Sequence, residues 1–344
     1  SVSNIAADAF RLRPATASTD SYLSAEEVSA FYMTLQNEFG SDWIVELGAR
    51  YEDFSQKISY PNNPANEGLL ETDDIYPAMN ITWRALEDYQ VRFGFSQTVS
   101  YPGLIERSES QSYDPQTDDP IFGAPDLKVS EIDNLDLRIE YYFGASNKAS
   151  LAFFTKEIDS PVERAIPDAS GSAAAGITFR NQKSAVLDGV ELDFNTMLID
   201  TDAHGFFVNG NLSYIDSEVS LTSKSLQLEG SGSEGRSLQG QSKYLANLQI
   251  GYDHYPTEQK VTLLLNYFDD RIFRVARGTA VGPIVEQGRL TVDLNYENIL
   301  SERWSLKLKA KNITNEPISY SQNEREIELY ETGTSISASL SYQL

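Results

Sequence analysis

Three aspartates lie close together in the stretch SYDPQTDDP at residues 112–120. Hard cations such as Ca²⁺ prefer carboxylate oxygens as ligands, so Asp114, Asp118 and Asp119 form a candidate calcium site. Their spacing differs from that of an EF-hand loop, and a solvated acidic loop explains the same residues. The region also holds aromatic residues that could stack on a ligand or form the rim of a barrel: Tyr101, Tyr113 and Phe122.

Catalytic chemistry has little support in the sequence. The two histidines, His204 and His254, fall in predicted short turns far apart in the chain, which favours solvated side chains over an active site. The residues show no Ser, His and Asp order, no phosphate-binding glycine loop and no metal-ligand spacing. Cysteine is absent, which excludes disulfides, thiolate catalysis and zinc fingers. We therefore expect no enzyme and no resident cofactor, apart from the hypothetical calcium ion.

The amino-acid composition limits the kinds of molecule that the protein can bind and the folds that it can adopt. The formal net charge of -24 argues against nucleic-acid binding, because a protein that neutralises phosphates needs clustered Lys and Arg. The 344 residues, 40% of them hydrophobic, are enough for two soluble domains or for one large barrel. The pattern of the hydrophobic residues must decide between these two architectures.

Most of the chain shows apolar and polar residues in alternation, the period of two that is typical of β-strands. In WSLKLKAKN at residues 304–312, Trp304, Leu306 and Leu308 share one face of a strand, and the lysines between them share the other. We expect about 13–14 antiparallel strands of this kind. The same alternation recurs in residues 43–53, 74–85, 89–97, 134–143, 147–157, 189–198, 205–214, 243–253, 260–268, 289–298 and 334–344.

These strands suit a membrane. No apolar run reaches the roughly 18 residues of a transmembrane helix, whereas strands of about ten residues can cross a bilayer at a tilt. Aromatic residues lie near the ends of the apolar faces, as interfacial girdles do; examples are Trp43, Tyr51, Tyr244, Tyr252 and Trp304. The pattern predicts an all-β fold, an antiparallel transmembrane β-barrel.

Connections of two lengths alternate along the chain. Short turns are predicted at 39–42, 86–88, 144–146, 199–203, 254–258 and 299–302. Long polar segments are predicted at 57–73, 102–130, 159–185, 218–240, 273–288 and 315–332. Barrels of the outer membrane place short turns in the periplasm and long loops outside, so we expect all the long segments at the extracellular end.

Residues 24–40 give two conflicting signals. Ser24 and Glu27 form a capping box, and apolar residues follow at helical spacing, which locally predicts an amphipathic helix. The turn at 39–42, however, needs a strand to pair with residues 43–53. We expect a strand here.

Four short motifs follow one another along the chain: ELGARYED at 46–53, GAPDLKVSEIDNLDLRIEYYF at 123–143, FRNQKSAVLDGVELDF at 179–194 and KAKNITNEP at 309–317. Residues 125–128 match the Pro-Asp-Leu-Lys of an NPDLKPE-like stretch. Asn181 and residues 189–192 match a pattern of Asn, a spacer and Gly-Val-Glu-Leu. In order and spacing, the four motifs resemble the C-terminal barrel of TonB-dependent outer-membrane receptors.

The resemblance implies a barrel of about 22 strands filled by an N-terminal plug with a TonB-contacting box. Residues 26–344 would be the C-terminal part of such a barrel, and residues 1–25 an extracellular loop or the end of a preceding strand. Neither plug nor box is visible here, so TonB would be contacted through a segment outside this chain. The last strand resembles the signal read by the barrel-assembly machinery, with Tyr342 and Leu344 as its residues.

The resemblance also implies a function. Such receptors take up a scarce nutrient, most often a ferric siderophore or other metal chelate, with energy delivered through TonB. The implied surroundings are the outer membrane of a Gram-negative bacterium, its bilayer and its lipopolysaccharide. Two alternatives remain open at this point: a passive porin with a polar lumen, and a soluble β-sandwich that buries its apolar faces against each other.

Charged residues on the polar faces are the remaining candidates for function. In an empty pore they would line water, and in a receptor we expect them to contact the plug. They are Arg50, Arg84, Arg92, Arg138 and Glu140 on sequential strands, with Lys307, Lys309 and Lys311 near the end of the chain.

Overall fold

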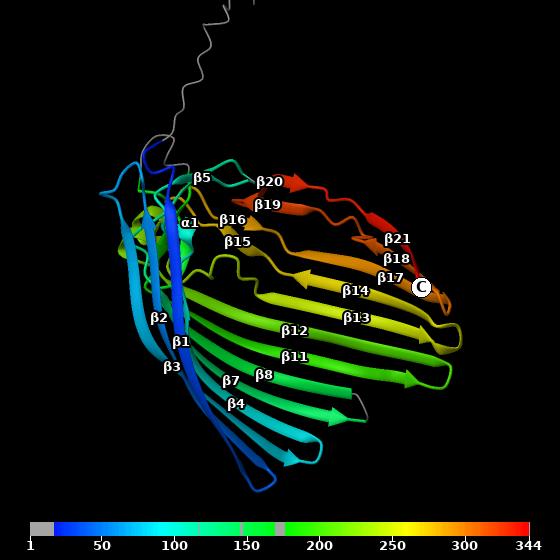
Figure 1. Cartoon of the computed structure of the whole chain (residues 1–344). Coiled ribbons are helices and arrows are strands. Elements are labelled where there is room, and N and C mark those ends of the chain that lie inside the picture. Colours follow the sequence, from blue (N-terminus) through cyan, green and yellow to red (C-terminus); the bar gives the residue numbers. More distant parts are fainter. Residues whose placement is uncertain (1–16, 116, 145–146, 169–175, 344) are drawn as a thin grey trace, which may run out of the picture.

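The computed structural model describes residues 17–115, 117–144, 147–168 and 176–343. One antiparallel sheet of 13 strands dominates it, with the strands in chain order (Figure 1). This confirms the all-β fold and the strand count expected from the alternation. The strands are β1 (Leu23–Phe39), β2 (Trp43–Ser59), β3 (Gly68–Leu86), β4 (Tyr89–Ser100), β7 (Ser130–Phe143), β8 (Asn147–Asp159), β11 (Ser184–Asp200), β12 (His204–Ser220), β13 (Tyr244–His254), β14 (Gln259–Phe268), β17 (Arg289–Ser301), β18 (Trp304–Lys311) and β21 (Ser335–Tyr342).

Residues 24–40 form a strand, as the turn at 39–42 requires. β1 pairs with β2 from Leu23 opposite Ser59 to Phe39 opposite Trp43, without a break in register. The segment forms a strand despite its helical spacing, because pairing with β2 satisfies the backbone hydrogen bonds along its whole length. Residues 1–16 of the predicted N-terminal segment lie outside the described residues.

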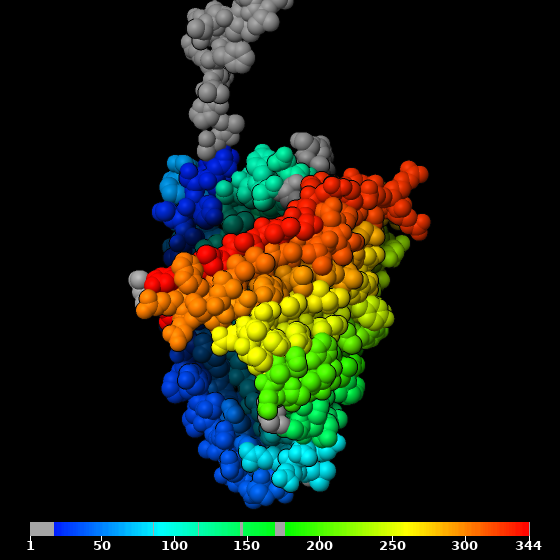
Figure 2. Space-filling model, turned by 90° about the vertical axis from the view of Figure 1, so that its right-hand side faces the viewer, coloured from blue at the N-terminus to red at the C-terminus, as the bar shows by residue number. Residues whose placement is uncertain are grey.

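Strand length varies along the sheet. β1, β2, β11 and β12 have 17 residues and β3 has 19, whereas β18 and β21 have 8 each. Figure 2 shows the later strands, from yellow to red, lying side by side and crossing the view obliquely. Such a tilt is typical of barrel strands.

The two faces of the sheet differ in polarity. One face, called the apolar face below, carries large exposed hydrophobic side chains such as Leu137 and Ile139. The opposite face, called the polar face, carries ion pairs between different strands. At the end with the short turns, aromatic side chains pair along the apolar face: Trp43 stacks on Trp83, Tyr89 stacks on Tyr141, and Trp304 lies tilted against Tyr342. These pairs mark the edge of the apolar band, where interfacial girdles are expected.

Five of the six predicted short turns lie where the sequence predicts them, at what is called the short-turn end, and one includes η4 (Tyr255–Thr257). In the sixth, at 144–146, residues 145–146 lie outside the described residues. One long connection is shorter than predicted. Residues 57–73 are mostly strand, because pairing continues to Ile58 opposite Gly68 and leaves only residues 60–67 between β2 and β3. The other long connections, at the long-loop end, cover residues 101–129, 160–183, 221–243, 269–288 and 312–334.

These five loops fold into small elements of their own near one end of the sheet (Figure 1). The sequence pattern did not predict them. They are α1 (Leu104–Arg107), β5 (Gln111–Tyr113), β6 (Pro120–Phe122), β9 (Val162–Ala165), β10 (Thr178–Asn181), α2 (Ser223–Glu229), η3 (Ser231–Ser233), β15 (Arg271–Arg274), β16 (Ile284–Glu286), β19 (Ile318–Gln322) and β20 (Arg325–Tyr330). No helix in the described part of the chain is long and apolar enough to cross a bilayer.

Buried hydrophobic residues gather beneath these loops. One cluster comprises Ile121, Leu127, Ile177 and Phe179, and it joins loop 101–129 to loop 160–183. A second comprises Ala185, Val219 and Leu221, where β11 and β12 enter their loops. The loops therefore have packed interiors that hold their polar residues in place.

Glycines on the polar face make room for aromatic rings. Gly189 of β11 lies opposite Phe154 of β8, and a Cβ built on Gly189 would overlap the ring. Gly251 of β13 lies under the ring of Phe207 in the same way. The aromatic ring covers the glycine backbone, an arrangement that supports sheet register. It gives a physical reason for the glycine of the Gly-Val-Glu-Leu motif.

Candidate ligand-binding site

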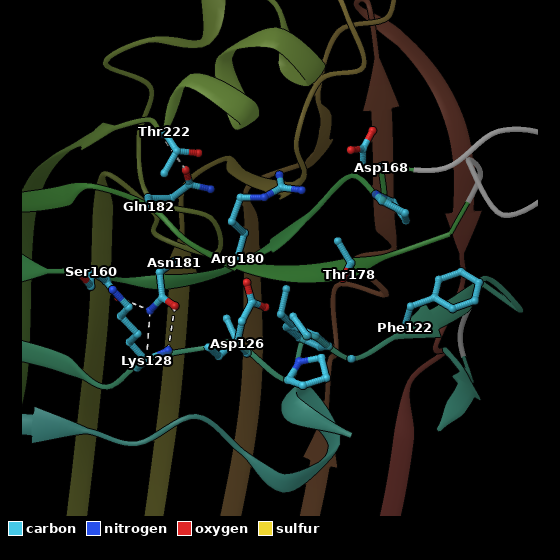
Figure 3. Close-up of a pocket in the computed structure, with 16 residues that line it drawn as sticks. Phe122, Asp126, Lys128, Ser160, Asp168, Thr178, Arg180, Asn181, Gln182 and Thr222 are labelled. Atoms are coloured by element: carbon cyan, nitrogen blue, oxygen red, sulfur yellow. Dashed lines mark hydrogen bonds between the residues drawn. The ribbon is translucent and has the colours of Figure 1, made fainter. Parts of the chain in front are cut away.

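Two of the sequence motifs meet at the long-loop end. The Asn181 side chain donates from Nδ2 to the carbonyl oxygens of Ser160, at 2.7 Å, and Lys128, at 3.1 Å. Its Oδ1 accepts from the Lys128 backbone N–H at 2.9 Å (Figure 3). One amide thus ties the Pro-Asp-Leu-Lys stretch to the point where β8 ends. The resemblance identified both motifs, but only the structure shows that they touch.

Replacing Asn181 with aspartate should loosen this junction. The carboxylate cannot donate to the two carbonyl oxygens, and we expect a cost of about 1–3 kcal/mol. Hydrogen exchange of the backbone in residues 123–130 should therefore become faster. Asn323→Asp is the matched control, since Asn323 Oδ1 only accepts, from the Gly282 N–H, and a carboxylate still can. Equal exchange in both variants would contradict this account.

A cavity of about 700 Å³, called the motif cavity, lies beside this junction. Gln182 is 2% exposed, accepts from the Thr222 N–H at 3.2 Å, and has no hydrogen-bond partner for its Nε2. Arg180, on the same side of the extended segment (Figure 3), donates to Ser225 Oγ and to the Ile166 carbonyl. Burial lowers the pKa of the Arg180 guanidinium, opposed by nearby carboxylates. Phe122, a predicted ligand contact, lines this cavity.

A second cavity of about 880 Å³, called the loop cavity, is lined by residues of all five long loops. This is the usual size of a small-molecule site. One ion pair lines it, with Arg271 Nη2 2.8 Å from Glu286 Oε2, and Glu163 also lines the cavity. Its aromatic lining consists of Tyr113, Phe179, Phe273 and Tyr320.

Of these aromatic residues only Tyr113 is a ligand contact predicted from the sequence. Arg271, Phe273 and Tyr320 were not predicted, although Phe273 and Tyr320 fall in predicted long loops and Arg271 lies just before one. The feature of the sequence that could have identified them is the presence of arginine and aromatic residues in the long loops of an acidic protein. Phe273 and Tyr320, whose ring centres are 4.8 Å apart, come together only through the pairing of β15, β16 and β19.

The acidic stretch is held by arginines from other loops. Asp114 is 5% exposed, and one of its oxygens lies 3.2 Å from Arg164 Nη1. Asp119 pairs with Arg274; burial acts to raise its pKa, but hydrogen bonds from Thr117 and Arg274 outweigh burial and lower it. Calcium binding stays a prediction, and the ion would compete with these arginines. Within the described ranges no group of three His, Cys, Asp or Glu could hold a metal.

Tyr101, the third predicted aromatic contact, packs against the sheet. Its ring stacks on Phe54 with centres 3.7 Å apart, and its hydroxyl donates to Glu52 Oε2 at 2.9 Å. Asp118 lies between Asp114 and Asp119 in a left-handed backbone conformation, with φ of 56°. The predicted ligand contacts therefore do not form one site: Phe122 lines the motif cavity, Tyr113 lines the loop cavity, and Tyr101 packs on the sheet.

The predicted charges of the polar face form a network across four strands. Glu140 of β7 accepts from Arg92 of β4 at 3.1 Å and from Arg138 at 3.2 Å. Arg138 also pairs with Asp193 of β11 at 2.8 Å and donates to Ser150 of β8 at 2.6 Å. These charges therefore have partners within the sheet. Contact with a plug stays a prediction.

The other predicted residues on the polar face and in the last strand have the following contacts. Arg50 pairs with Glu52 on β2, and Arg84, at the short-turn end, lies 3.4 Å from the Ser41 carbonyl. Tyr342 of the predicted assembly signal contacts Trp304 and accepts from Arg303 Nη1 at 3.1 Å. Leu344 lies outside the described residues.

A buried clasp joins two of the long loops. Arg236 of loop 221–243 lies 2.9 Å from Glu163 of β9 and 2.8 Å from Glu229 of α2. The three side chains are 9%, 4% and 2% exposed. Burial would lower the pKa of Arg236, but hydrogen bonds to Glu229 and Glu163 outweigh burial and raise it. The clasp fixes one wall of the loop cavity, because Glu163 also lines that cavity.

Several solved structures have a similar fold. Among solved structures, the chain is similar to the siderophore receptor PiuA of Acinetobacter baumannii, with 17% identity and a TM-score of 0.69 over 94% of this chain and 44% of that one. It is also similar to the ferric yersiniabactin uptake receptor FyuA of Yersinia pestis, with 16% identity and a TM-score of 0.63 over 94% and 46%.

The FrpB iron transporter of Neisseria meningitidis gives 15% identity and a TM-score of 0.63 over 93% of this chain and 45% of that one. The chain thus spans less than half the length of these three proteins. No curated protein matches it. The family described as TonB dependent receptor-like, beta-barrel matches residues 3–315. With its antiparallel sheet and membrane-type apolar face, the chain belongs to this family of TonB-dependent receptor barrels.

Proposed function

We propose that the protein is an outer-membrane receptor that takes up a scarce nutrient, a ferric siderophore or another metal chelate, with energy delivered through TonB. Membership of the receptor family and the names of the similar solved structures support this proposal. In this arrangement the long-loop end faces the outside of a Gram-negative cell, and the short-turn end faces the periplasm.

The loop cavity is the observation that carries the proposal. It brings residues of five loops together on the side from which a nutrient arrives, and it combines aromatic rings with charged groups. Rings can pack on the flat ligand groups of a chelate, and Arg271 can donate to an anionic one. Each arginine described at this wall already has a carboxylate partner, so the cavity selects a ligand by shape as well as by charge.

The proposed receptor function also implies which partners the protein has. The TonB complex would act on a plug segment outside this chain, and the polar-face network would face that plug. The apolar face would contact the bilayer and lipopolysaccharide, and the barrel-assembly machinery would read the last strand. An enzymatic activity is not part of the proposal.

Uptake by iron-starved cells tests the proposal. A strain lacking the gene is supplied with hydroxamate, catecholate and mixed-ligand ferric chelates, and growth is compared with that of the complemented strain. We expect rescue by one class only, and none when TonB is inactive. Rescue that does not depend on TonB would instead identify a passive channel, the alternative that the polar face also allows.

A variant of the loop cavity ties uptake to this site. Arg271→Gln should weaken binding of the rescuing chelate about tenfold or more, because a charged hydrogen bond contributes about 1.5–3 kcal/mol. Arg325→Gln is the matched control, since Arg325 is exposed on β20 and does not line the cavity. Binding is measured on whole cells with the radiolabelled chelate. Equal loss in both variants would place the ligand elsewhere.

A further inference from the structure

The only two histidines of the chain face each other at the short-turn end. His204 is the first residue of β12 and His254 is the last residue of β13, and the register places them directly opposite. Their ring centres are 5.1 Å apart, with an angle of 42° between the planes. The sequence suggests two separate turn histidines, because a long loop and two strands lie between them in the chain. The structure joins them into a histidine pair.

Each ring is oriented by a hydroxyl group at Nδ1. His204 Nδ1 lies 2.8 Å from the Tyr252 hydroxyl oxygen, and His254 Nδ1 lies 2.5 Å from Thr257 Oγ1. When these oxygens accept the Nδ1 protons, Nε2 of each ring keeps a free lone pair. Histidines that bind metals are commonly held in this way, by a hydrogen bond from the nitrogen that does not bind the metal. The hydroxyl contacts therefore orient both rings and are compatible with the tautomer that leaves Nε2 free to bind a metal.

The spacing of the rings fits one shared ion. Zinc binds imidazole nitrogen at about 2.0–2.1 Å, and two such ligands at a tetrahedral angle have ring centres about 5 Å apart. The observed separation of 5.1 Å agrees with this distance. We propose that His204 and His254 bind one divalent transition-metal ion of the zinc type through their Nε2 atoms, with water in the remaining positions.

Charge around the pair favours a cation. The two turns and the strand ends beside them carry Asp200, Asp202, Asp253 and Glu258, and Lys260 lies 3.8 Å from Asp253. Asp200 accepts from the Tyr255 hydroxyl at 3.2 Å. In the described part of the chain no carboxylate completes a group of three ligands, so binding should be weaker than at a structural zinc site with four protein ligands. We expect a dissociation constant on the order of micromolar.

Zinc titration of the full-length receptor in detergent tests the site. The purification tag must contain no histidine, because histidines of the tag would bind zinc themselves. Isothermal titration with zinc chloride should show a site that depends on His204 and His254. His204→Ala and His254→Ala should each weaken it about tenfold or more, and Tyr252→Phe, which keeps both rings, should weaken it less. Asp216→Asn, the same change at the long-loop end of β12, is the matched control and should leave the affinity unchanged.

A second measurement does not depend on any variant folding. Diethyl pyrocarbonate modifies histidine, and mass spectrometry can follow the adducts at residues 204 and 254 separately. Zinc should slow modification of both residues at the same zinc concentration. Protection of neither residue, or of one alone, would overturn the proposal. Zinc binding of unchanged affinity in both alanine variants would also overturn it and would assign the ion to surface carboxylates. The site is independent of which nutrient the receptor takes up.

Discussion

Replacing Arg236 with leucine is expected to separate loop 160–183 from loop 221–243. The substitution leaves Glu163 and Glu229 buried without their cation, and removal of one partner from a buried ion pair costs about 3–5 kcal/mol. The loops can relieve this cost by opening and hydrating the carboxylates. Hydrogen exchange should therefore become much faster in residues 162–165 and 223–239, and binding to the loop cavity should weaken.

Two further variants isolate the cause. Lys243→Leu removes an exposed lysine that pairs with Asp216 at 3.0 Å, and surface pairs contribute about 0–1 kcal/mol, so little should change. Adding Glu163→Gln and Glu229→Gln to Arg236→Leu removes the buried negative charges and should restore much of the protection. Failure of this triple variant to recover would show that packing of the arginine, rather than its charge, holds the loops together.

Placing valine at Gly189 is expected to disturb assembly of the sheet. The new side chain would occupy the position of the Phe154 ring on the neighbouring strand. Overpacking of this kind typically costs about 1–3 kcal/mol, and here it also acts on the register between β8 and β11. Less of the protein should reach the folded form, measured by heat-modifiable electrophoretic mobility and by urea unfolding.

The partner residue provides the decisive control. Phe154→Ala combined with Gly189→Val removes the overlap, so the pair should lose less stability than the sum of the single variants. Gly232→Val should be nearly neutral, because a Cβ there meets nothing within 4 Å. Additive losses at residues 154 and 189 would show that the ring does not depend on the glycine.

The sheet could be predicted from the sequence because its signal is local. Each strand alternates apolar and polar residues over its own length, as residues 304–312 do, so no knowledge of partners is needed. Residues 24–40 show the limit of local signals: their spacing fits a helix, and the pairing with β2 decides the outcome. The small strands of the loops, such as β9 and β10 with four residues each, are too short to show a period.

The candidate site was less predictable because it depends on contacts between distant segments. Glu163 and Arg236 are 73 residues apart in the chain, and no spacing rule joins them. The same holds for the loop cavity, which takes its lining from five loops, and for the histidine pair. The resemblance did identify Asn181 and residues 125–128, whose contact the structure then explained.

The unequal lengths of the strands have a consequence for what other molecules meet at the cell surface. A strand needs about 9–11 residues to cross a bilayer, and each further residue adds about 3.3 Å. β1 to β3, β11 and β12, with 17 to 19 residues, exceed this length, whereas β18 and β21 do not. In an outer membrane the long strands would extend beyond the lipid among the lipopolysaccharide sugars, and β18 and β21 would end closer to the lipid. Antibodies and phages should therefore find epitopes at the outer ends of the long strands and on the connection at residues 60–67.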